Sequence, residues 1–414
     1  MFIDTVIKQI QTLRRNIKSF FLYSLNSYKF RYFFASFLSY IINLYLKKSE
    51  AEEKKYSTNN IKRVLIIYSK RHFDPSDDSN DKTFSKSSAA NIARNIYYAF
   101  SEKKETYYID KDDETATIPK VDLIIGILGK NFVRSAKLNP SAKKILFLVN
   151  SHPLFRLKAL INESKKLGKI FPHSEYISPI EFTKAQFYTD KMILIGNKKV
   201  RQTYIERGVE ERDIYLINSG VNLETLTPIS GAKDSDKIRI IYPGSHLAIR
   251  KGVFRVMEIW AKLMETIDEN SVELFILGKS DVFSQDILNF QKKYKNVSYI
   301  GWVDSSTEEY VNLLRSSHIM IAPSIEEGQV GCALESMACG CVPIITEICG
   351  IAISDKEGFL IKDHTDVDRF VEKIREMIVD REKLDSLSSN ARLFIEKNHN
   401  WDSFRKTIRK ISLK

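Results

Sequence analysis

The chain contains two successive series of short apolar segments, separated by stretches with the spacing of amphipathic helices. We predict the strands of the first series at Arg63–Tyr68, Glu105–Ile109, Val121–Leu128, Lys144–Val149, Met192–Ile195 and Ile214–Ile217. Between them, Ala89–Phe100 has helical spacing, since Ile92, Ile96 and Phe100 recur every four residues. Strands that alternate with helices predict a parallel sheet covered by helices.

The second series begins after Pro228 and repeats this pattern. Its predicted strands are Ile238–Tyr242, Val272–Leu277, Val297–Ile300, Ile319–Ala322, Val342–Ile345 and Phe359–Ile361. Helical segments follow at Val367–Ile378 and Arg381–Ile395, and a last basic helix lies around Trp401–Ile411. A chain of 414 residues is too long for one ordinary domain. We therefore expect an α/β protein with two Rossmann-like domains.

Residues 1–48 differ from the rest of the chain in composition. They are rich in aromatic and aliphatic residues, hold eight Lys or Arg and one acid, and so supply 8 − 1 = +7 of the net charge of +12. Their longest uncharged run, Tyr32–Leu46, is shorter than the ~20 residues of a membrane span. Basic residues among apolar ones predict amphipathic helices on an anionic membrane surface. The alternative is a helical extension packed on protein, and no motif indicates nucleic acid.

A dinucleotide-binding dehydrogenase also has two such halves, but its glycine-rich fingerprint is missing here. The loop after Tyr68 runs to Asn91 without a glycine. Ser87, Ser88, Ala89 and Ala90 are small residues that can replace glycine at the helix start. The spacing of the four cysteines matches no zinc site, so we expect them to be small buried residues. Nothing indicates a disulfide framework, so we expect a reducing cytoplasm.

The segment Pro323–Ile351 holds the most closely spaced candidate functional residues. Glu327 in a glycine-bearing loop and Glu335 on a predicted helix, Cys332–Ala338, are spaced E-x7-E. The helix start near Gly331 offers free N–H groups and the positive end of a dipole, which suits a phosphate. Two carboxylates on either side of a phosphate seat can hold a nucleotide-sugar. On spacing alone, a solvated acidic loop and a surface glutamate are the better interpretation.

The surrounding pattern resembles the family 4 retaining glycosyltransferases, which have the GT-B fold. The residues that carry the resemblance are Pro323, Ser324, Glu327, Gly328, Glu335, Met337, Ala338, Gly340, Pro343 and Gly350. The turn Asn218–Pro228, the segment Tyr242–Gly252, Gly278 and Gly301 also fit, so the resemblance covers about residues 63–411. It implies two Rossmann-like domains facing a central cleft.

The resemblance also implies roles for individual residues. Lys251 would neutralise the donor diphosphate, and His152, after a predicted strand, would contact the donor sugar. The family has an arginine where this chain has Ser245, and Arg250 is the nearest replacement. Glu327 would hold sugar hydroxyls and Glu335 the ribose. The remaining predicted donor contacts are Gly244, Gly328, Gln329, Val330 and Gly331.

We therefore expect a retaining, metal-independent hexosyltransferase that needs no cofactor beyond its nucleotide-sugar. A lipid-linked or surface-polysaccharide acceptor and a peripheral position on the cytoplasmic face of the membrane fit the basic composition. The alternatives are an epimerase or phosphorylase of the same fold, or a non-catalytic membrane-docked relative. The expected regions are an extension (1–60), an acceptor domain (61–228), a nucleotide-sugar domain (229–390) and a helix that crosses back (391–414).

Overall fold

The computed structural model describes residues 61–76, 88–169, 178–233, 235–246, 248–280 and 282–413, without the side chains of residues 245 and 246. The predicted amphipathic extension, residues 1–48, lies outside these ranges, as does most of the polar loop after Tyr68. None of the helices in the described ranges combines the length and the apolar character that crossing a membrane requires.

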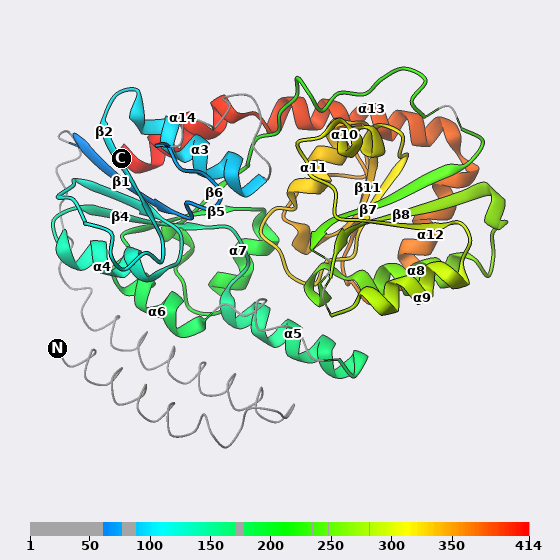
Figure 1. Ribbon diagram of the computed structural model, residues 1–414, viewed down its shortest axis with the longest axis horizontal. Helices are drawn as coiled ribbons and strands as arrows, with labels where there is room; N and C mark the ends of the chain where they lie inside the picture. The colour runs from blue at the N-terminus through cyan, green and yellow to red at the C-terminus, as the bar shows by residue number, and fades with distance from the viewer. Residues whose placement is uncertain are drawn as a thin grey trace.

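Two parallel six-stranded sheets form the centre of the structure (Figure 1). The first has the order β2-β1-β3-β4-β5-β6, and the second β12-β11-β10-β7-β8-β9. The strands of the first are β1 (Arg63–Tyr68), β2 (Glu105–Asp110), β3 (Leu123–Gly126), β4 (Lys143–Leu148), β5 (Lys191–Ile195) and β6 (Ile214–Ile217). Those of the second are β7 (Ile238–His246), β8 (Val272–Lys279), β9 (Val297–Gly301), β10 (Ile319–Ala322), β11 (Val342–Thr346) and β12 (Phe359–Ile361). The predicted α/β class and all twelve predicted strands are confirmed.

Helices cover both faces of each sheet. Within the first domain these are α3 (Ser88–Ser101), α4 (Lys130–Leu138), α5 (Pro153–Leu167), α6 (Pro179–Phe187) and α7 (Lys198–Ile205). Within the second they are α8 (Val253–Leu263), α9 (Ser284–Lys293), α10 (Glu308–Arg315), α11 (Gly331–Ala338), α12 (Val367–Val379) and α13 (Arg381–Asn398). Short 3-10 turns are η3 (Glu211–Asp213), η4 (Ile249–Lys251), η5 (Glu269–Ser271) and η6 (Glu347–Cys349).

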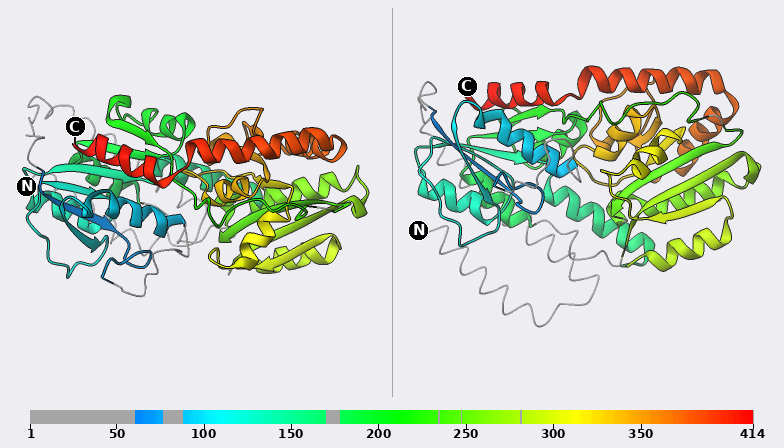
Figure 2. Two further views of the ribbon diagram at one scale, coloured as in Figure 1. Left: turned by 90° about the horizontal axis from the view of Figure 1, so that it is seen from above. Right: turned by 45° about the horizontal axis from the view of Figure 1, so that its top comes forward.

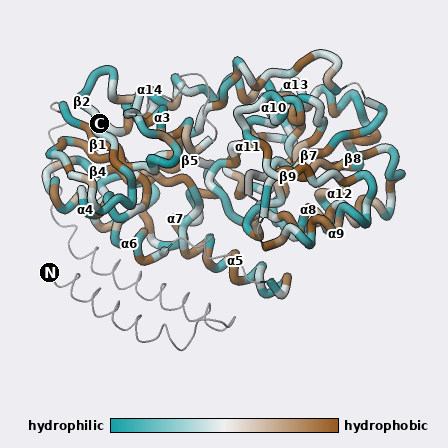
Figure 3. Tube along the Cα trace, in the orientation of Figure 1, coloured by the Kyte–Doolittle hydropathy of each residue, from teal (hydrophilic) through white to brown (hydrophobic). Residues whose placement is uncertain are grey.

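The strands are apolar on both faces because each sheet is buried on both sides. In β1, Val64 and Ile66 pack in the cluster under α3, while Leu65 and Ile67 pack in the cluster under α4 and α6. In Figure 3 the hydrophobic stretches accordingly concentrate in the strands, and hydrophilic positions gather on the outer helices. The apolar runs seen in the sequence are thus the buried strands of two cores.

Two elements connect the domains beyond the chain link at residues 218–237. Helix α5 follows a first-domain strand, yet its Leu157, Leu160 and Ile161 are buried in the second-domain cluster with α8 and α12. Helix α14 (Trp401–Leu413) crosses back, and its Phe404 and Ile408 pack in the first-domain cluster (Figure 2). The crossing lies at His399 and Asn400, whereas the boundary predicted at residue 391 falls inside α13.

The loop after β10 makes a close contact between the domains at Gly328. A Cβ atom at this glycine would lie 2.0 Å from the carbonyl oxygen of Val149, at the end of β4. The Gly328 carbonyl in turn leaves no room for a side chain at Gly350 and little at Gly196. The backbones at Gly328, Val149 and Gly350 therefore meet here, with Gly196 close by. Only glycine at residues 328 and 350 allows so close an approach.

Gly328→Ala tests this contact. The added methyl group has to push the domains apart, and overpacking of this kind typically costs about 1–3 kcal/mol. Gly168→Ala is the comparison without a clash: nothing lies within 4 Å of the added atom, so its cost comes only from its φ of +62°, a strain that Gly328 does not share. We expect a larger fall in the free energy of unfolding for Gly328→Ala than for Gly168→Ala, measured by urea denaturation. Equal losses would contradict the contact.

Candidate active site

The segment from β10 to β11 has the predicted strand, loop, helix and strand. Helix α11 starts at Gly331, ends at Ala338, and is followed by Gly340 with φ +81°. Cys339, Cys341 and Cys349 are buried and Cys332 is partly buried, as expected for packing residues. In the described part of the chain, no cluster of three or more His, Cys, Asp or Glu side chains is arranged to hold a metal ion.

Glu327 and two cations form a cluster in the cleft. One carboxylate oxygen, Oε1, lies 2.5 Å from Lys251 Nζ and 3.0 Å from Arg250 Nη1. The Glu327 side chain is 6% exposed, while both basic side chains are about one-fifth exposed, at 19% and 20%. Arg250 and Lys251 come from η4, so a turn of the second domain presents both cations to one carboxylate.

Gly252 fixes the position of that turn. Its φ is +77°, and a Cβ atom would lie 2.0 Å from the carbonyl oxygen of Pro323. A side chain is therefore excluded by conformation and by space. This explains the Lys-Gly pair in the sequence: the glycine brings η4 against the loop that carries Glu327.

A cavity of ≈ 130 Å³ opens beside this cluster. Its walls combine the end of β7 with the starts of α11 and α3, and are formed by Ser88, Pro243, Gly244, Lys251, Leu277, Trp302, Val303, Ser305, Tyr310, Gly331, Cys332 and Glu335. The starts of the two helices nearly touch, since a Cβ atom at Gly331 would lie 2.8 Å from Ser88 Oγ. Positive ends of helix dipoles and Lys251 thus converge on one space, which favours an anionic ligand.

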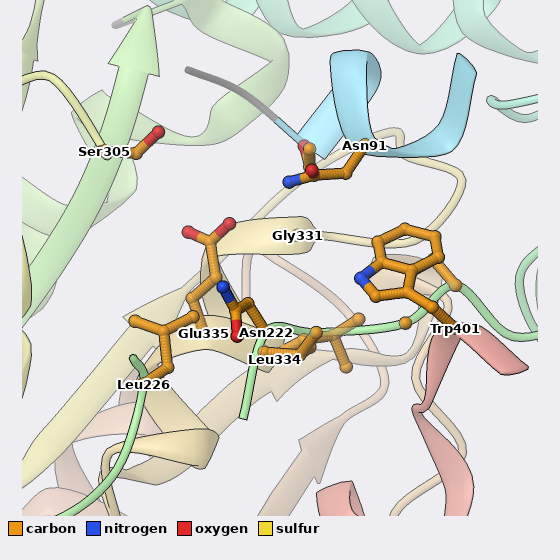
Figure 4. A pocket seen from close by; sticks show the side chains of 12 residues that line it. Asn91, Asn222, Leu226, Ser305, Gly331, Leu334, Glu335 and Trp401 are labelled. Carbon is orange, nitrogen blue, oxygen red and sulfur yellow. The ribbon is translucent and has the colours of Figure 1, made fainter. Parts of the chain in front are cut away.

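A smaller adjoining cavity of ≈ 50 Å³ shares Ser88, Ser305, Gly331 and Glu335 with the first. In Figure 4, Glu335 and Asn222 lie on one side of this cavity and Asn91 of α3 on the other. The rest of its lining includes Leu334 of α11 and residues of the two chain segments that run between the domains, among them Gly220 and Trp401. Both domains therefore contribute polar groups around Glu335.

Tyr310 orients Glu335. The Tyr310 hydroxyl donates to Glu335 Oε2 at 2.6 Å. Burial raises the pKa of Glu335, and the hydrogen bond from Tyr310 only partly offsets that effect. The other carboxylate oxygen is left to accept a hydrogen bond from a ligand hydroxyl.

Several of the residues predicted to contact the donor line neither of these two cavities. Gly328 meets the first domain, and Gln329 Oε1 accepts from Ser219 N and Oγ at 2.9 and 2.8 Å. Val330 is buried in the core beside α11. Of the predicted residues, Gly244, Lys251, Gly331 and Glu335 line the first cavity, while Arg250 and Glu327 lie in the adjacent ion cluster. The Ser245 side chain lies outside the described part.

His152 caps a helix in this structure. Its Nδ1 accepts from Leu154 N at 3.1 Å, and its ring packs edge-on against Phe182 and Tyr204. Burial lowers its pKa to about 3, and Arg207 adds to the effect. The side chain is 4% exposed and lines neither cavity, so contact between His152 and a donor sugar stays a prediction.

Glu326 was not predicted from the sequence and has a clear role. It is completely buried, accepts from Ser151 Oγ at 2.9 Å, and lies 3.4 Å from Arg156. These partners belong to the first domain, so Glu326 fastens the loop while its neighbour Glu327 faces the cations. The signal in the sequence is an acid next to Glu327 within an otherwise apolar, buried segment.

The pKa of Glu327 leads to a prediction. Burial alone would raise this pKa, but Lys251 and Arg250 more than offset burial and lower it. The stabilisation is then present above the unfolded pKa, about 4.3, and is lost as the pH falls through the lower folded value. Glu327→Gln should therefore reduce stability most at neutral pH, with the difference from wild type shrinking below pH about 4. Urea denaturation across this range measures it, and a difference independent of pH would contradict the ion cluster.

The second domain is similar to a family of known proteins. Residues 226–394 match the family Glycosyl transferases group 1. An uncharacterized glycosyltransferase of Methanocaldococcus jannaschii is 26% identical over 233 residues, which are 56% of this chain and 61% of the relative. The UDP-Gal:alpha-D-GlcNAc-diphosphoundecaprenol alpha-1,3-galactosyltransferase of Escherichia coli is 24% identical over 226 residues, which are 49% of this chain and 55% of the relative. The matches thus span between about half and three-fifths of these relatives.

Solved structures extend the similarity to the fold of both domains. Sucrose-phosphate synthase from Thermosynechococcus elongatus has a TM-score of 0.63 at 15% identity, over 84% of this chain and 98% of that one. WaaG, a glycosyltransferase involved in lipopolysaccharide biosynthesis, has a TM-score of 0.57 at 14% identity, over 84% and 99%. Residues 226–394 of this chain are thus similar to the glycosyl transferases group 1 family, and the two domains together have the GT-B fold.

Proposed function

We propose that this protein is a retaining glycosyltransferase that moves a hexose-type sugar from a nucleotide-sugar to a hydroxyl of a lipid-linked or surface-polysaccharide acceptor. The observation that carries the proposal is the convergence of Lys251 and the start of α11 on one cavity, with Arg250 held next to Lys251 by Glu327. The cations and helix N–H groups provide positive charge for a diphosphate, and the two carboxylates provide acceptors for hydroxyl groups on either side of it.

The charges explain how the bond to the leaving group breaks. As the sugar departs, negative charge grows on the diphosphate, and fixed cations stabilise that charge more than they stabilise the intact donor. Lys251 lines the cavity directly, and Arg250 is held beside it by the same carboxylate. We propose that Arg250 supplies the second cation in place of the arginine that the family has at Ser245.

Glu327 and Glu335 have different proposed roles. Glu327, beside the cations, accepts hydrogen bonds from sugar hydroxyls. Its ion pairs with Lys251 and Arg250 then weaken, so both cations can interact with the diphosphate. Glu335, held by Tyr310, accepts from the ribose. The orientation that Tyr310 imposes favours one ribose position over others.

Retention of configuration needs either a carboxylate nucleophile or departure and attack on one face of the sugar. A further carboxylate on the same loop, Glu326, is fully buried and engaged by Ser151 and Arg156. We therefore propose attack from the face of the leaving group, with the departing phosphate accepting the proton of the acceptor hydroxyl.

Relatives suggest which ligands to test first. The name of the E. coli relative specifies UDP-Gal as donor and a diphosphoundecaprenol-linked sugar as acceptor. One structural neighbour, HepE from Anabaena, was solved in complex with UDP, at a TM-score of 0.60 over 85% of this chain. Uridine donors and a lipid diphosphate acceptor are therefore the first choice.

The test is transfer from UDP-galactose and UDP-glucose to a sugar-diphosphate lipid, with product anomers assigned by NMR. We expect an α-linked product from these α-linked donors, unchanged rates with EDTA, and a fall in kcat of about 10²–10³-fold for Lys251→Ala. Lys198→Ala, an exposed lysine elsewhere, is the matched control. An inverted product would contradict retention. Conversion of donor without acceptor, or only with free phosphate, would favour an epimerase or a phosphorylase, and no turnover of any donor would favour a non-catalytic relative.

A further inference from the structure

A third and larger cavity lies between the domains, away from the proposed donor site. Its volume is ≈ 640 Å³, and it shares no lining residue with the two cavities around Glu335. Its walls come from α5 and α7 of the first domain, and from the residues that follow β10, β11 and β12 of the second. In Figure 1, α5 and α7 lie on the side of the molecule opposite α13 and α14.

The loop after β10 separates the two regions. Ser324 and Ile325 line the larger cavity, whereas Gly331 and Glu335, farther along the same segment, line the proposed donor site. Ile325 packs in the core cluster with α5, α8 and α12, while Val330 packs in the cluster with α10 and α11. The two cavities therefore open on opposite faces of the second sheet.

The lining of this cavity is strongly basic. Six basic side chains surround it, namely Lys158, Lys165, Lys166, Lys199, Arg207 and Lys362, against three acidic ones, Glu163, Glu206 and Asp363. Lys158, Asn162 and Lys166 recur every four residues, so they share one face of α5. Lys158 and Lys166 are exposed and lie about two helical turns apart, so α5 presents two separate cations to the cavity.

The acidic side chains offset only part of this positive charge: Lys166 lies near enough to Asp363 to lower its pKa, and Lys199 pairs with Glu347 at 3.8 Å. Glu163 is buried and pairs with Arg255 at 2.6 Å and with His364 at 3.2 Å. Glu206 lies 3.5 Å from Arg207, and Asp363 accepts from Thr365 N and Oγ1 at 2.9 Å. Within the described ranges, ion pairs are recorded for none of the lysines Lys158, Lys165, Lys166 and Lys362.

Size and charge together define the ligand. Sites for small molecules have volumes of roughly 300–1,000 Å³, and this cavity falls in that range. The exposed cations of α5 on one side and Lys362 on the other favour an anion that reaches both domains. Lys165 and Lys166 lie in the last turn of α5, where they interact favourably with the negative end of the helix dipole. That interaction does not explain Lys158, which lies earlier in the helix, or Lys362, which lies outside it.

We propose that this basic cavity binds an anion with two or more phosphate groups, which bridges α5 of the first domain and the residues after β12 of the second. Such a ligand would hold the two domains in the arrangement seen here. Its phosphates come either from a soluble polyphosphate or from the headgroups of an anionic lipid. This site is independent of the proposed glycosyl transfer.

The experiment uses the full chain and the variant Lys158→Ala/Lys362→Ala, which removes one cation from each domain. Lys198→Ala/Lys292→Ala removes the same charge from exposed positions outside the cavity. Inorganic pyrophosphate is titrated by calorimetry, and flotation is measured with phosphatidylcholine vesicles that contain or lack phosphatidylglycerol. Lys251→Ala is titrated in parallel, because pyrophosphate that binds at the proposed donor site is lost in that variant alone.

A soluble ligand predicts pyrophosphate binding that weakens at least tenfold in Lys158→Ala/Lys362→Ala, and persists in Lys251→Ala and in the control. A lipid headgroup predicts the same pattern for flotation with phosphatidylglycerol, without pyrophosphate binding at this site. The proposal is overturned if Lys158→Ala/Lys362→Ala matches the control in both assays. Equal weakening in the control would also overturn it, since that result indicates net charge rather than a site.

Discussion

The close approach of three backbones at Gly328 is the constraint on which the arrangement of the two domains depends. The chain of the second domain meets the end of β4 there, with no space for a side chain at Gly328 or Gly350. A contact of this kind has little tolerance, because interiors are close-packed and clashes are relieved only by moving whole elements. It therefore fixes how far the loop that carries Glu326 and Glu327 projects towards the first domain.

That position explains the division of labour between the two adjacent glutamates. Glu326 turns to Ser151 and Arg156 of the first domain, and Glu327 turns to Arg250 and Lys251 of the second. Burying a carboxylate is costly unless it is paired and hydrogen-bonded; Glu326 Oε1 accepts from Ser151, whereas Oε2 has no hydrogen-bond partner and only the ion pair with Arg156 at 3.4 Å. One short loop thus contributes both to the contact between the domains and to the cationic cluster. Separating the domains would therefore change both.

Most of the fold could be predicted from the sequence, because strands buried on both faces produce apolar runs that can be recognised locally. The motif from Glu327 to Glu335 was equally visible, since its spacing lies within one segment. Contacts between the domains were not predictable in this way. The placement of α5 in the second core, the role of Gly328 in the seam and the capping role of His152 depend on residues far apart in the chain. The basic cavity is likewise assembled from five separate segments, none of which carries a motif.

Nucleotide binding shows whether the cavity beside Lys251 is a nucleotide-sugar site. Calorimetric titration of the full chain with UDP, GDP and ADP, in the absence of divalent metal, should give tight binding of one nucleotide. Glu335→Ala should bind that nucleotide more weakly, because the mutation removes the carboxylate that Tyr310 orients. Failure of all three nucleotides to bind, or equal binding by wild type and Glu335→Ala, would contradict the account.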